Sequence, residues 1–314
     1  MPRIKILDTF AIPVPKYDML KDQGTVSLFT DIPESDEITL RRAEGADVIV
    51  INKTKLTAAV IEQLEGVQLV AETASGYDNI DIKAAAAAGI TVCNAPGYST
   101  ASVAELVFNL VQAMYRKLDA CKAQVAQDGW LDEPLLGREL NGKTMGVVGF
   151  GKIGQATATI AKGYGMRCIV HTGNPAKYRD DFSDIEFVDL PAVFQQADIV
   201  SLHIPHNDAT DKLVGTDLLA KLKPGSVLVN TARGGVVDEQ ALMHTLKDGL
   251  ISACLDVLTV EPMQAGHPLK DFNNVIISPH VGWYTDEAVD RLMQITHDNI
   301  AKFYARSPQN VVAM

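Results

Sequence analysis

The chain has 314 residues, 47% of them hydrophobic, and this length is sufficient for two domains of ordinary size, each with its own core. Its formal net charge of -11 and its pI of about 5.1 predict an acidic surface. Such a surface repels phosphate backbones, which excludes nucleic acid as the main partner. No window approaches the roughly 20 apolar residues that a membrane helix requires, and the N-terminal apolar run is too short for a signal peptide.

Four cysteines lie far apart in the sequence, at Cys93, Cys121, Cys168 and Cys254, and none belongs to a C-x-x-C pair. This pattern is typical of scattered thiols in a reducing compartment, so we expect a cytoplasmic protein.

Strand-like and helix-like segments alternate through the first 97 residues. Short apolar runs predict strands, and longer runs between them predict helices. This alternation predicts a small α/β domain on a parallel sheet. The predicted strands are Ile4–Leu7, Val48–Ile51, Leu69–Glu72 and Thr91–Val92, and the predicted helices are Leu56–Leu64 and Ile82–Ala88.

Turn-forming residues from Asn94 to Thr100 end this first alternation. A long helix is expected from Ala101 to about Cys121, and a second alternation follows it. The pattern of Asp286–Phe303 then predicts an amphipathic helix. The predicted strands of the second alternation are Thr144–Val148, Cys168–His171, Ile199–Leu202, Val227–Asn230, Ser252–Asp256 and Val275–Ile277.

A glycine-rich loop, Gly149-Phe150-Gly151-Lys152-Ile153-Gly154, lies between the first of these strands and a helical segment from Gln155 to Gly163. Gly149 permits a tight turn, Gly151 lets the backbone approach a pyrophosphate, and Gly154 lets the helix pack on the strand. The N-terminus of the helix then faces the anion. An ordinary strand–turn–helix is the weaker interpretation, and the loop predicts a dinucleotide site.

The residues at the end of the second predicted strand of this domain do not discriminate clearly between NAD and NADP. Sites that prefer NAD usually carry Asp or Glu there, but this chain has His171-Thr172-Gly173. Lys177 and Arg179 are near enough to meet a 2′-phosphate, although a solvated loop explains them equally well. The cofactor is therefore predicted to be NAD or NADP, with a lean to NADP.

Six motifs, present in the family's order, make the chain resemble the D-isomer-specific 2-hydroxy acid dehydrogenases over nearly its full length. It is most similar to their glycerate dehydrogenase/hydroxypyruvate reductase branch. The motifs are Thr73–Asp81, Pro96–Glu105, the glycine loop, Asn230–Gly235, Asp256-Val257 with Glu261-Pro262, and Pro279–Trp283.

The resemblance implies an α/β fold of two doubly wound parallel-sheet domains. A Rossmann cofactor domain would span residues 98–285. A smaller, flavodoxin-like substrate domain would span residues 1–97 and be completed by the C-terminal segment 286–314. The implied enzyme is an NAD(P)-dependent oxidoreductase that reduces small anionic 2-oxo acids, such as hydroxypyruvate and glyoxylate, to D-2-hydroxy acids.

Three residues receive catalytic roles from the resemblance. Arg233 matches the arginine that holds the substrate carboxylate, His280 matches the general acid/base, and Glu261 matches its carboxylate partner. Each follows a predicted strand of the second domain, and ligands of open α/β sheets bind beyond the carboxyl ends of the strands. We therefore expect the three to meet in one crevice. A structural ion-pair network is the alternative.

Further contacts are implied for the substrate and the cofactor. The backbone amides of Ser75 and Gly76 match the loop that receives the substrate carboxylate, and Lys53 is a positive charge for the substrate's distal group. No metal is expected, because His203, His206 and Asp208 lack the spacing of a four-ligand site. The implied cofactor contacts are Thr100, Gly149, Gly151, Lys152, Ile153, Gly154, Thr172, His203, Pro205, Thr231, Ala232, Arg233, Asp256, His280 and Gly282.

Several alternatives stay open at this point. A D-lactate or D-3-phosphoglycerate dehydrogenase would keep the same chemistry, and an NAD(H)-sensing interaction protein would belong to another class. The segment Cys121–Leu140, with Trp130 and Leu135-Leu136, is unusually apolar for a connection. We expect a second subunit to cover it in a homodimer, unless it folds back on its own domain.

Overall fold

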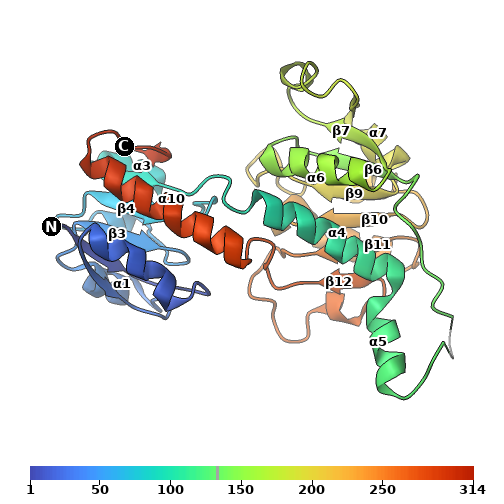
Figure 1. Cartoon of the computed structure of the whole chain (residues 1–314), viewed down its shortest axis with the longest axis horizontal. Helices are drawn as coiled ribbons and strands as arrows, with labels where there is room; N and C mark the ends of the chain where they lie inside the picture. The colour runs from blue at the N-terminus through green and yellow to red at the C-terminus, as the bar shows by residue number, and fades with distance from the viewer. Residues whose placement is uncertain (132–133) are drawn as a thin grey trace. The chain divides into compact units, whose positions relative to one another are not determined.

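The computed structural model describes residues 1–131 and 134–314, and the chain divides into two compact units. The first unit contains residues 1–99 and 284–314, and the second contains residues 100–283. Figure 1 shows helices flanking a sheet in each unit. The predicted α/β class with two parallel-sheet domains is confirmed. Two residues of the segment 121–140, at 132 and 133, lie outside the described residues.

The sheet of the first unit has the strand order β13-β5-β4-β3-β1-β2. All neighbours are parallel except β13, which is antiparallel to β5 at the edge. The fully buried Val-Ile-Val-Ile sequence of β3 suits a central strand that is covered on both faces. The strands are β1 (Arg3–Ile6), β2 (Thr25–Leu28), β3 (Val48–Ile51), β4 (Leu69–Glu72), β5 (Thr91–Cys93) and β13 (Val311–Ala313).

Side-chain caps begin most helices of the first unit. Ser35, Thr57, Asp81 and Thr285 each accept a hydrogen bond from a backbone amide of the first turn, which satisfies donors that a helix start leaves open. The helices are η1 (Val14–Asp22, a 3-10 helix), α1 (Asp36–Ala43), α2 (Ala58–Ile61), α3 (Ile82–Ala87) and α10 (Asp286–Tyr304).

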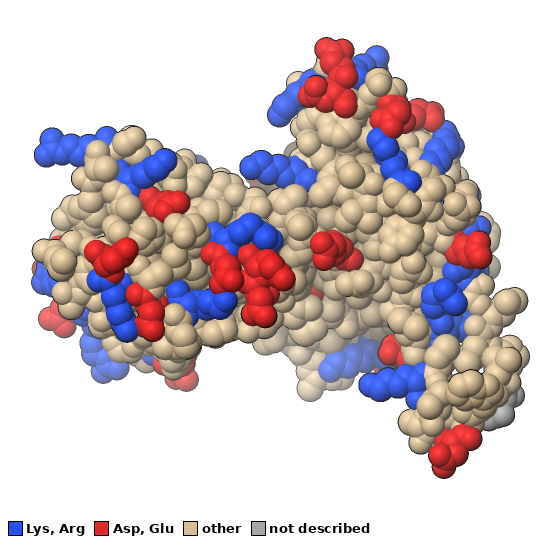
Figure 2. Space-filling model, viewed as in Figure 1, with Lys and Arg blue, Asp and Glu red and all other residues tan. Residues whose placement is uncertain are grey.

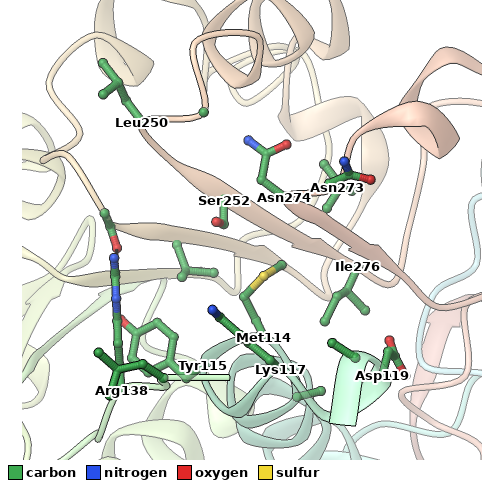
Figure 3. Close-up of a pocket in the computed structure, with 17 residues that line it drawn as sticks. Met114, Tyr115, Lys117, Asp119, Arg138, Leu250, Ser252, Asn273, Asn274 and Ile276 are labelled. Carbon is green, nitrogen blue, oxygen red and sulfur yellow. Dashed lines mark hydrogen bonds between the residues drawn. The ribbon is translucent and has the colours of Figure 1, made fainter. Parts of the chain in front are cut away.

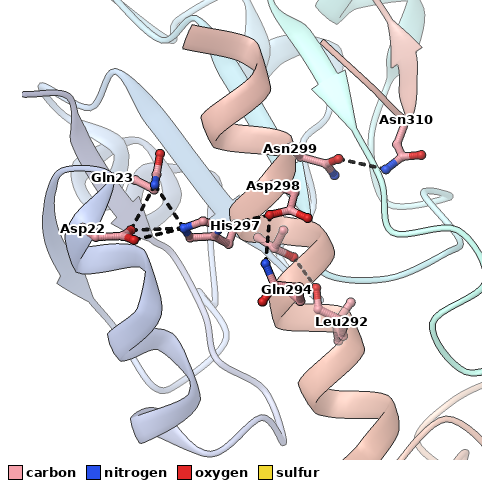
Figure 4. Close-up of polar contacts among 9 residues, drawn as sticks. Asp22, Gln23, Leu292, Gln294, His297, Asp298, Asn299 and Asn310 are labelled. Atoms are coloured by element: carbon pink, nitrogen blue, oxygen red, sulfur yellow. Dashed lines mark hydrogen bonds and ion pairs between the residues drawn. The ribbon is translucent and has the colours of Figure 1, made fainter. Parts of the chain in front are cut away.

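The C-terminal helix α10 packs within the first unit and is tied to it by polar contacts (Figure 4). Asn299 donates through Nδ2 to the carbonyl of Asn94 at 2.8 Å. His297 lies between two carboxylates: its Nε2 is 3.2 Å from Oδ2 of Asp22 in η1, and its Nδ1 is 3.1 Å from Oδ1 of Asp298. Burial lowers the pKa of His297, but the hydrogen bonds to Asp298 and Asp22 outweigh it and raise that pKa overall.

The second unit has a seven-stranded parallel sheet with the order β12-β11-β10-β9-β6-β7-β8. The order reverses between β6 and β9, and ligands of open α/β sheets bind at such a switch point. The strands are β6 (Thr144–Val148), β7 (Arg167–His171), β8 (Glu186–Phe187), β9 (Ile199–Leu202), β10 (Val227–Asn230), β11 (Ser252–Leu255) and β12 (Val275–Ile277).

Two hydrophobic cores cover the two faces of this sheet. Val227 and Val229 of β10 belong to one core, and Leu228 between them belongs to the other, as the two-residue period of a strand requires. Helices α4 (Thr100–Arg116) and α6 (Lys152–Gly163) pack side by side on one face (Figure 1). Helices α7 (Leu190–Gln196), α8 (Thr216–Leu219) and α9 (Glu239–Leu246) supply side chains to the other core.

The predicted single helix Ala101–Cys121 is wrong in one respect. Lys117 has a φ of 50°, which ends α4 and starts a separate helix, α5 (Leu118–Ala126). A residue in the left-handed conformation interrupts the backbone hydrogen bonds of an α-helix. Composition does not reveal this break, because the residues on both sides of Lys117 favour helix. The predicted helix Leu56–Leu64 is also shorter and is confined to α2.

Acidic and basic side chains are interspersed on the face shown in Figure 2. None of the helices in the described part of the chain combines the length and apolar character needed to cross a membrane.

Candidate active site

The glycine loop after β6 depends on two close backbone approaches. Gly149 has a φ of +94°, and a Cβ there would lie 2.4 Å from the carbonyl oxygen of His203. A Cβ on Gly154 would lie 2.2 Å from the carbonyl oxygen of Gly149. The amide of Gly149 donates to the carbonyl of His171 at 2.8 Å. The loop is therefore packed against β7 and β9 at the switch point, and a side chain at either glycine would disrupt it.

The middle of this loop leaves room for a phosphate group. A Cβ on Gly151 would meet nothing within 4 Å. Gly151 also precedes α6 without a side-chain cap, so the first amides of α6, at Lys152 and Ile153, are available to an anion. The buried Thr231 hydroxyl after β10 has no hydrogen-bond partner among the described residues. These features fit a nicotinamide dinucleotide.

The end of β7 carries no carboxylate. His171 contacts the carbonyl of Val188 through Nδ1 at 3.2 Å, so its imidazole is engaged in the fold. Thr172 follows as a half-buried residue, and Lys177 and Arg179 are exposed in the next turn. The Lys177 ammonium lies 5.2 Å from the ring centre of Tyr178.

The three predicted catalytic residues follow three neighbouring strands. Arg233 follows β10, Glu261 follows β11 and His280 follows β12, and these strands lie side by side in the sheet. Nδ1 of His280 is 2.6 Å from Oε2 of Glu261. Glu261 is itself fixed, because Oε1 accepts a hydrogen bond from the amide of Leu258 at 3.0 Å. The carboxylate therefore orients the imidazole, and Nε2 is the nitrogen on the opposite side of the ring.

The loop that carries Arg233 is held by the last residue of β10. Asn230 is 1% exposed, and its side chain accepts from the amide of Ala232 and donates to the carbonyl of Arg233, at 3.0 and 2.9 Å. A Cβ on Gly234 would lie 1.9 Å from the carbonyl carbon of Leu258. The Arg233 loop and the loop before Glu261 are thus in direct backbone contact, which only glycine allows.

Asp256, after β11, holds the turn that carries His280. Its carboxylate accepts from the Ser278 hydroxyl at 2.6 Å, and from the amides of Val281 and Gly282 at 2.9 and 2.8 Å. Burial raises the pKa of Asp256, and these hydrogen bonds act in the opposite direction. His280 has a φ of 55° and donates its amide to the Asp256 carbonyl at 2.8 Å. We infer that Asp256 positions His280, a role that the sequence motif did not reveal.

Candidate substrate-binding residues of the first unit lie in loops after strands of its own sheet. Ser75 donates its hydroxyl to the Ala95 carbonyl at 2.9 Å, and Gly76 follows it, half-buried. Lys53 is exposed, and its ammonium lies 5.1 Å from the ring centre of Phe10. Sequence reasoning did not single out Asp8, whose carboxylate accepts from the amide of Lys53 at 3.1 Å.

The other implied cofactor residues occupy the second unit. Thr100 is the first residue of α4, and His203 and Pro205 follow β9. Burial lowers the pKa of His203 to about 4, so this imidazole is neutral, and Nε2 lies 2.9 Å from the Ser201 hydroxyl. Across the described residues, no group of three or more His, Cys, Asp or Glu side chains is placed to hold a metal ion.

A cavity of about 490 Å³ opens at the opposite edge of the second unit's sheet (Figure 3). Its lining includes Val227, Ser252 and Val275, which stand at the amino ends of their strands, and Arg138 beside Tyr115. Dinucleotides bind at the carboxyl ends of the strands, so we do not assign the cofactor to this cavity.

A family model described as "D-isomer specific 2-hydroxyacid dehydrogenase, NAD binding domain" matches residues 108–282. The chain belongs to this family, and it is an oxidoreductase that acts on the CH–OH group of donors. The predicted family and enzyme class are confirmed.

Individual relatives and a solved structure are similar to the chain over most of its length. The chain is similar to a hydroxypyruvate reductase of Thermotoga maritima, with 37% identity over 87% of this chain and 90% of that protein. It is 36% identical to a D-3-phosphoglycerate dehydrogenase of Methanocaldococcus jannaschii over 99% of this chain, which spans 60% of that protein. A solved acyclic imino acid reductase in complex with NADPH and D-Arg is 32% identical, with a TM-score of 0.90 and 99% of both chains covered. The matched family and this neighbour support NAD(P) as the cofactor.

Proposed function

We propose that the protein reduces small 2-oxo acids, such as hydroxypyruvate and glyoxylate, to D-2-hydroxy acids. The observation that carries the proposal is the His280–Glu261 contact of 2.6 Å, at the same sheet edge as Arg233. The relative named hydroxypyruvate reductase supports this choice of substrate. We take residues 98–285 as the cofactor domain, and residues 1–97 with 286–314 as the substrate domain.

In this proposal, each catalytic residue has one task. The Arg233 guanidinium pairs with the substrate carboxylate and polarises the reacting carbonyl, for which a planar and permanently charged fork is suited. His280 gives its Nε2 proton to the carbonyl oxygen, and Glu261 keeps the ring oriented and stabilises its charged form. Ser75 and Gly76 offer backbone amides to the carboxylate, and Lys53 meets the distal group. The dinucleotide, when bound, supplies the hydride.

The proposal predicts which substitutions remove activity. His280→Ala and Arg233→Ala should each lower kcat/KM for hydroxypyruvate by at least about a hundredfold, because proton transfer and charge stabilisation each contribute on that scale. His244→Ala, in α9, is the matched control for removal of an imidazole and should keep near-full activity. Near-full rates in the His280 or Arg233 variant would contradict the catalytic assignment.

We further propose that the protein prefers NADPH. Thr172 stands where an acid would bind the ribose hydroxyls of NAD, and Lys177 and Arg179 lie in the exposed turn that follows. The NADPH-bound imino acid reductase, a relative with this fold, supports the preference. Comparison of kcat/KM for NADPH and NADH with one substrate tests it, and a preference for NADH would contradict it.

A substrate panel decides among the alternatives within the class. Hydroxypyruvate, glyoxylate, pyruvate and phosphohydroxypyruvate, each with both cofactors, separate the proposed reductase from a D-lactate or D-3-phosphoglycerate dehydrogenase. Binding of NAD(H) without turnover of any 2-oxo acid would favour the NAD(H)-sensing interaction protein instead.

We also propose a cytoplasmic homodimer. The location rests on the scattered cysteines of the sequence. The dimer rests on α5, which buries none of its own residues, and on the large exposed apolar side chains in and after it. Figure 2 shows few charged side chains on the projection in this part of the unit. An exposed patch of this kind marks an interface. The exposed side chains are Leu118, Val125, Trp130, Leu131 and Leu136, at 52%, 58%, 83%, 73% and 87%.

A second copy is the occupant that this surface fits. The patch adjoins the 490 Å³ cavity, which Leu136 and Lys117 help to line (Figure 3), so one face offers both projecting apolar side chains and a recess. A two-fold interface requires this self-complementarity. Light scattering should give twice the chain mass of 33.9 kDa. Trp130→Glu with Leu136→Glu should halve it, whereas Val14→Glu should not. A monomeric wild type would contradict the dimer.

A further inference from the structure

Two buried carboxyl groups lie beneath loops of the first unit that are proposed to contact the substrate. Asp8 follows β1 and Glu72 ends β4, and their exposed fractions are 0% and 1%. The loops above them carry Lys53 and Ser75. The proposed reaction uses neither carboxyl group, so their burial needs another explanation.

Asp8 has many hydrogen-bond donors around it. Its carboxylate accepts from the amides of Asn52, Lys53 and Thr54 at 3.2, 3.1 and 3.0 Å, and from the Thr54 hydroxyl. A carboxylate with several donors is well compensated for burial. Asp8 therefore holds the loop after β3 in place.

Glu72 is far less well satisfied. Its Oε2 accepts from Nδ2 of Asn79 at 3.1 Å, and its Oε1 has no hydrogen-bond partner among the described residues. The same Nδ2 donates to the Thr54 carbonyl at 2.9 Å. Asn79 thus links Glu72 to the loop that Asp8 holds, and it ends the segment 75–79 that carries the proposed carboxylate site.

An anion at Glu72 would be unfavourable, because a buried charge needs several hydrogen bonds or a close counter-ion. Burial raises the pKa of Glu72 well above its ordinary value; Asn79 and Lys53 oppose this, and Asp8 and Asp78 reinforce it. The phenol of Tyr17 on η1 completes the surroundings, and its pKa is raised by its own burial and by Asp8. The geometry and these charges agree on a neutral Glu72.

We propose that Glu72 is a positioning residue that acts as a neutral carboxylic acid: it holds Asn79, and thereby the segment 75–79, in the form that binds the substrate carboxylate. A neutral group supports the loop without placing negative charge beneath an anion site. The substrate part of this inference rests on the proposed function, whereas the neutrality of Glu72 does not.

The first experiment tests neutrality and needs no substrate. Above pH 4.5, the ordinary pKa of a Glu side chain, the unfolded chain loses the Glu72 proton and the native protein keeps it. The folding constant of the wild type should therefore fall, relative to Glu72→Gln, by about tenfold per pH unit until the native group ionises. Glu65→Gln, at an exposed carboxyl of the same unit, corrects for the loss of one charge. A constant ratio between pH 5 and pH 8 would overturn the proposal.

The second experiment tests positioning through KM and kcat for hydroxypyruvate. Glu72→Gln keeps a neutral planar group of the same size and should keep KM within about twofold, whereas Glu72→Met should raise KM about tenfold with little change in kcat, as loss of uniform binding does. An unchanged KM in Glu72→Met, or a KM raised equally in both variants, would overturn the positioning role. If the Met variant does not fold, Glu72→Gln still tests the neutrality of Glu72 in the first experiment, and a KM raised well beyond twofold in Glu72→Gln would still overturn the positioning role.

The two proposals fail in different ways. A wild-type protein that reduces no 2-oxo acid would defeat the proposed function, and the pH dependence of folding would still test Glu72. A wild type that reduces hydroxypyruvate with no effect of Glu72→Met would defeat only the inference drawn from Glu72.

Discussion

Replacement of Asp256 by alanine tests how the catalytic histidine is held. The carboxylate accepts three hydrogen bonds, from Ser278, Val281 and Gly282, and two of these donors are backbone amides that alanine would leave without their acceptor. Each unmet buried donor costs about 1–3 kcal/mol. Burial raises the pKa of Asp256, which shows that its buried charge is itself unfavourable. Removal of that charge therefore offsets part of the stability lost with the hydrogen bonds. We expect a net loss of about 3 kcal/mol.

The measurements are thermal unfolding and steady-state kinetics. A loss of this size should lower Tm by about 6–12 °C, given about 2–4 °C per kcal/mol for a unit of this length. The turn that carries His280 should relax, and a misplacement of about 1 Å can cost about a hundredfold in kcat. Ser278→Ala removes only one of the three donors and should cost about 1 kcal/mol, with a small effect on kcat. An Asp256→Ala variant with unchanged Tm and kcat would refute the positioning of His280 by Asp256.

Three further predictions concern Thr172 after β7, the glycine loop and the C-terminal helix. Thr172→Asp should shift the ratio of kcat/KM for NADH over NADPH by about tenfold or more, because a carboxylate binds ribose hydroxyls and repels a 2′-phosphate; an unchanged ratio would contradict this. Gly154→Ala should destabilise the protein by about 1–3 kcal/mol, because its Cβ would lie 2.2 Å from the Gly149 carbonyl oxygen, whereas Gly163→Ala in the same helix meets no atom within 4 Å and should not. The raised pKa of His297 adds stability that is fully present below about pH 6.5, the ordinary value for histidine, and is lost as the pH rises through the native value. His297→Gln should therefore lower Tm more at pH 6 than at pH 9, and an equal loss at both would count against the ion pairs.

Local patterns in the sequence predicted most of the strands of both sheets and the glycine loop as a dinucleotide site, but they missed the short C-terminal strand β13, although its sequence Val-Val-Ala is apolar. The successful predictions were possible because strand burial and the turn at Gly149 depend on residues that are close in sequence. The polar elements were less visible: β2 and α1 expose much of their surface and show little apolar periodicity. The left-handed Lys117 that divides α4 from α5 gave no signal either, since lysine is an ordinary helix former.

The motifs and their order also determined the family and the candidate roles of Arg233, Glu261 and His280. They could do so because each of these residues lies within a short contiguous motif that is visible without the fold. Only the tertiary structure could pair groups that are distant in the chain. It placed the Asp256 carboxylate on the turn before Gly282, 26 positions away, and the Asp22 carboxylate on His297, 275 positions away. It also buried Glu72 with a single donor. Such contacts form only when folding brings distant segments of the chain together. Their chemistry depends on burial and on neighbours in space, and a local sequence pattern gives no information on either.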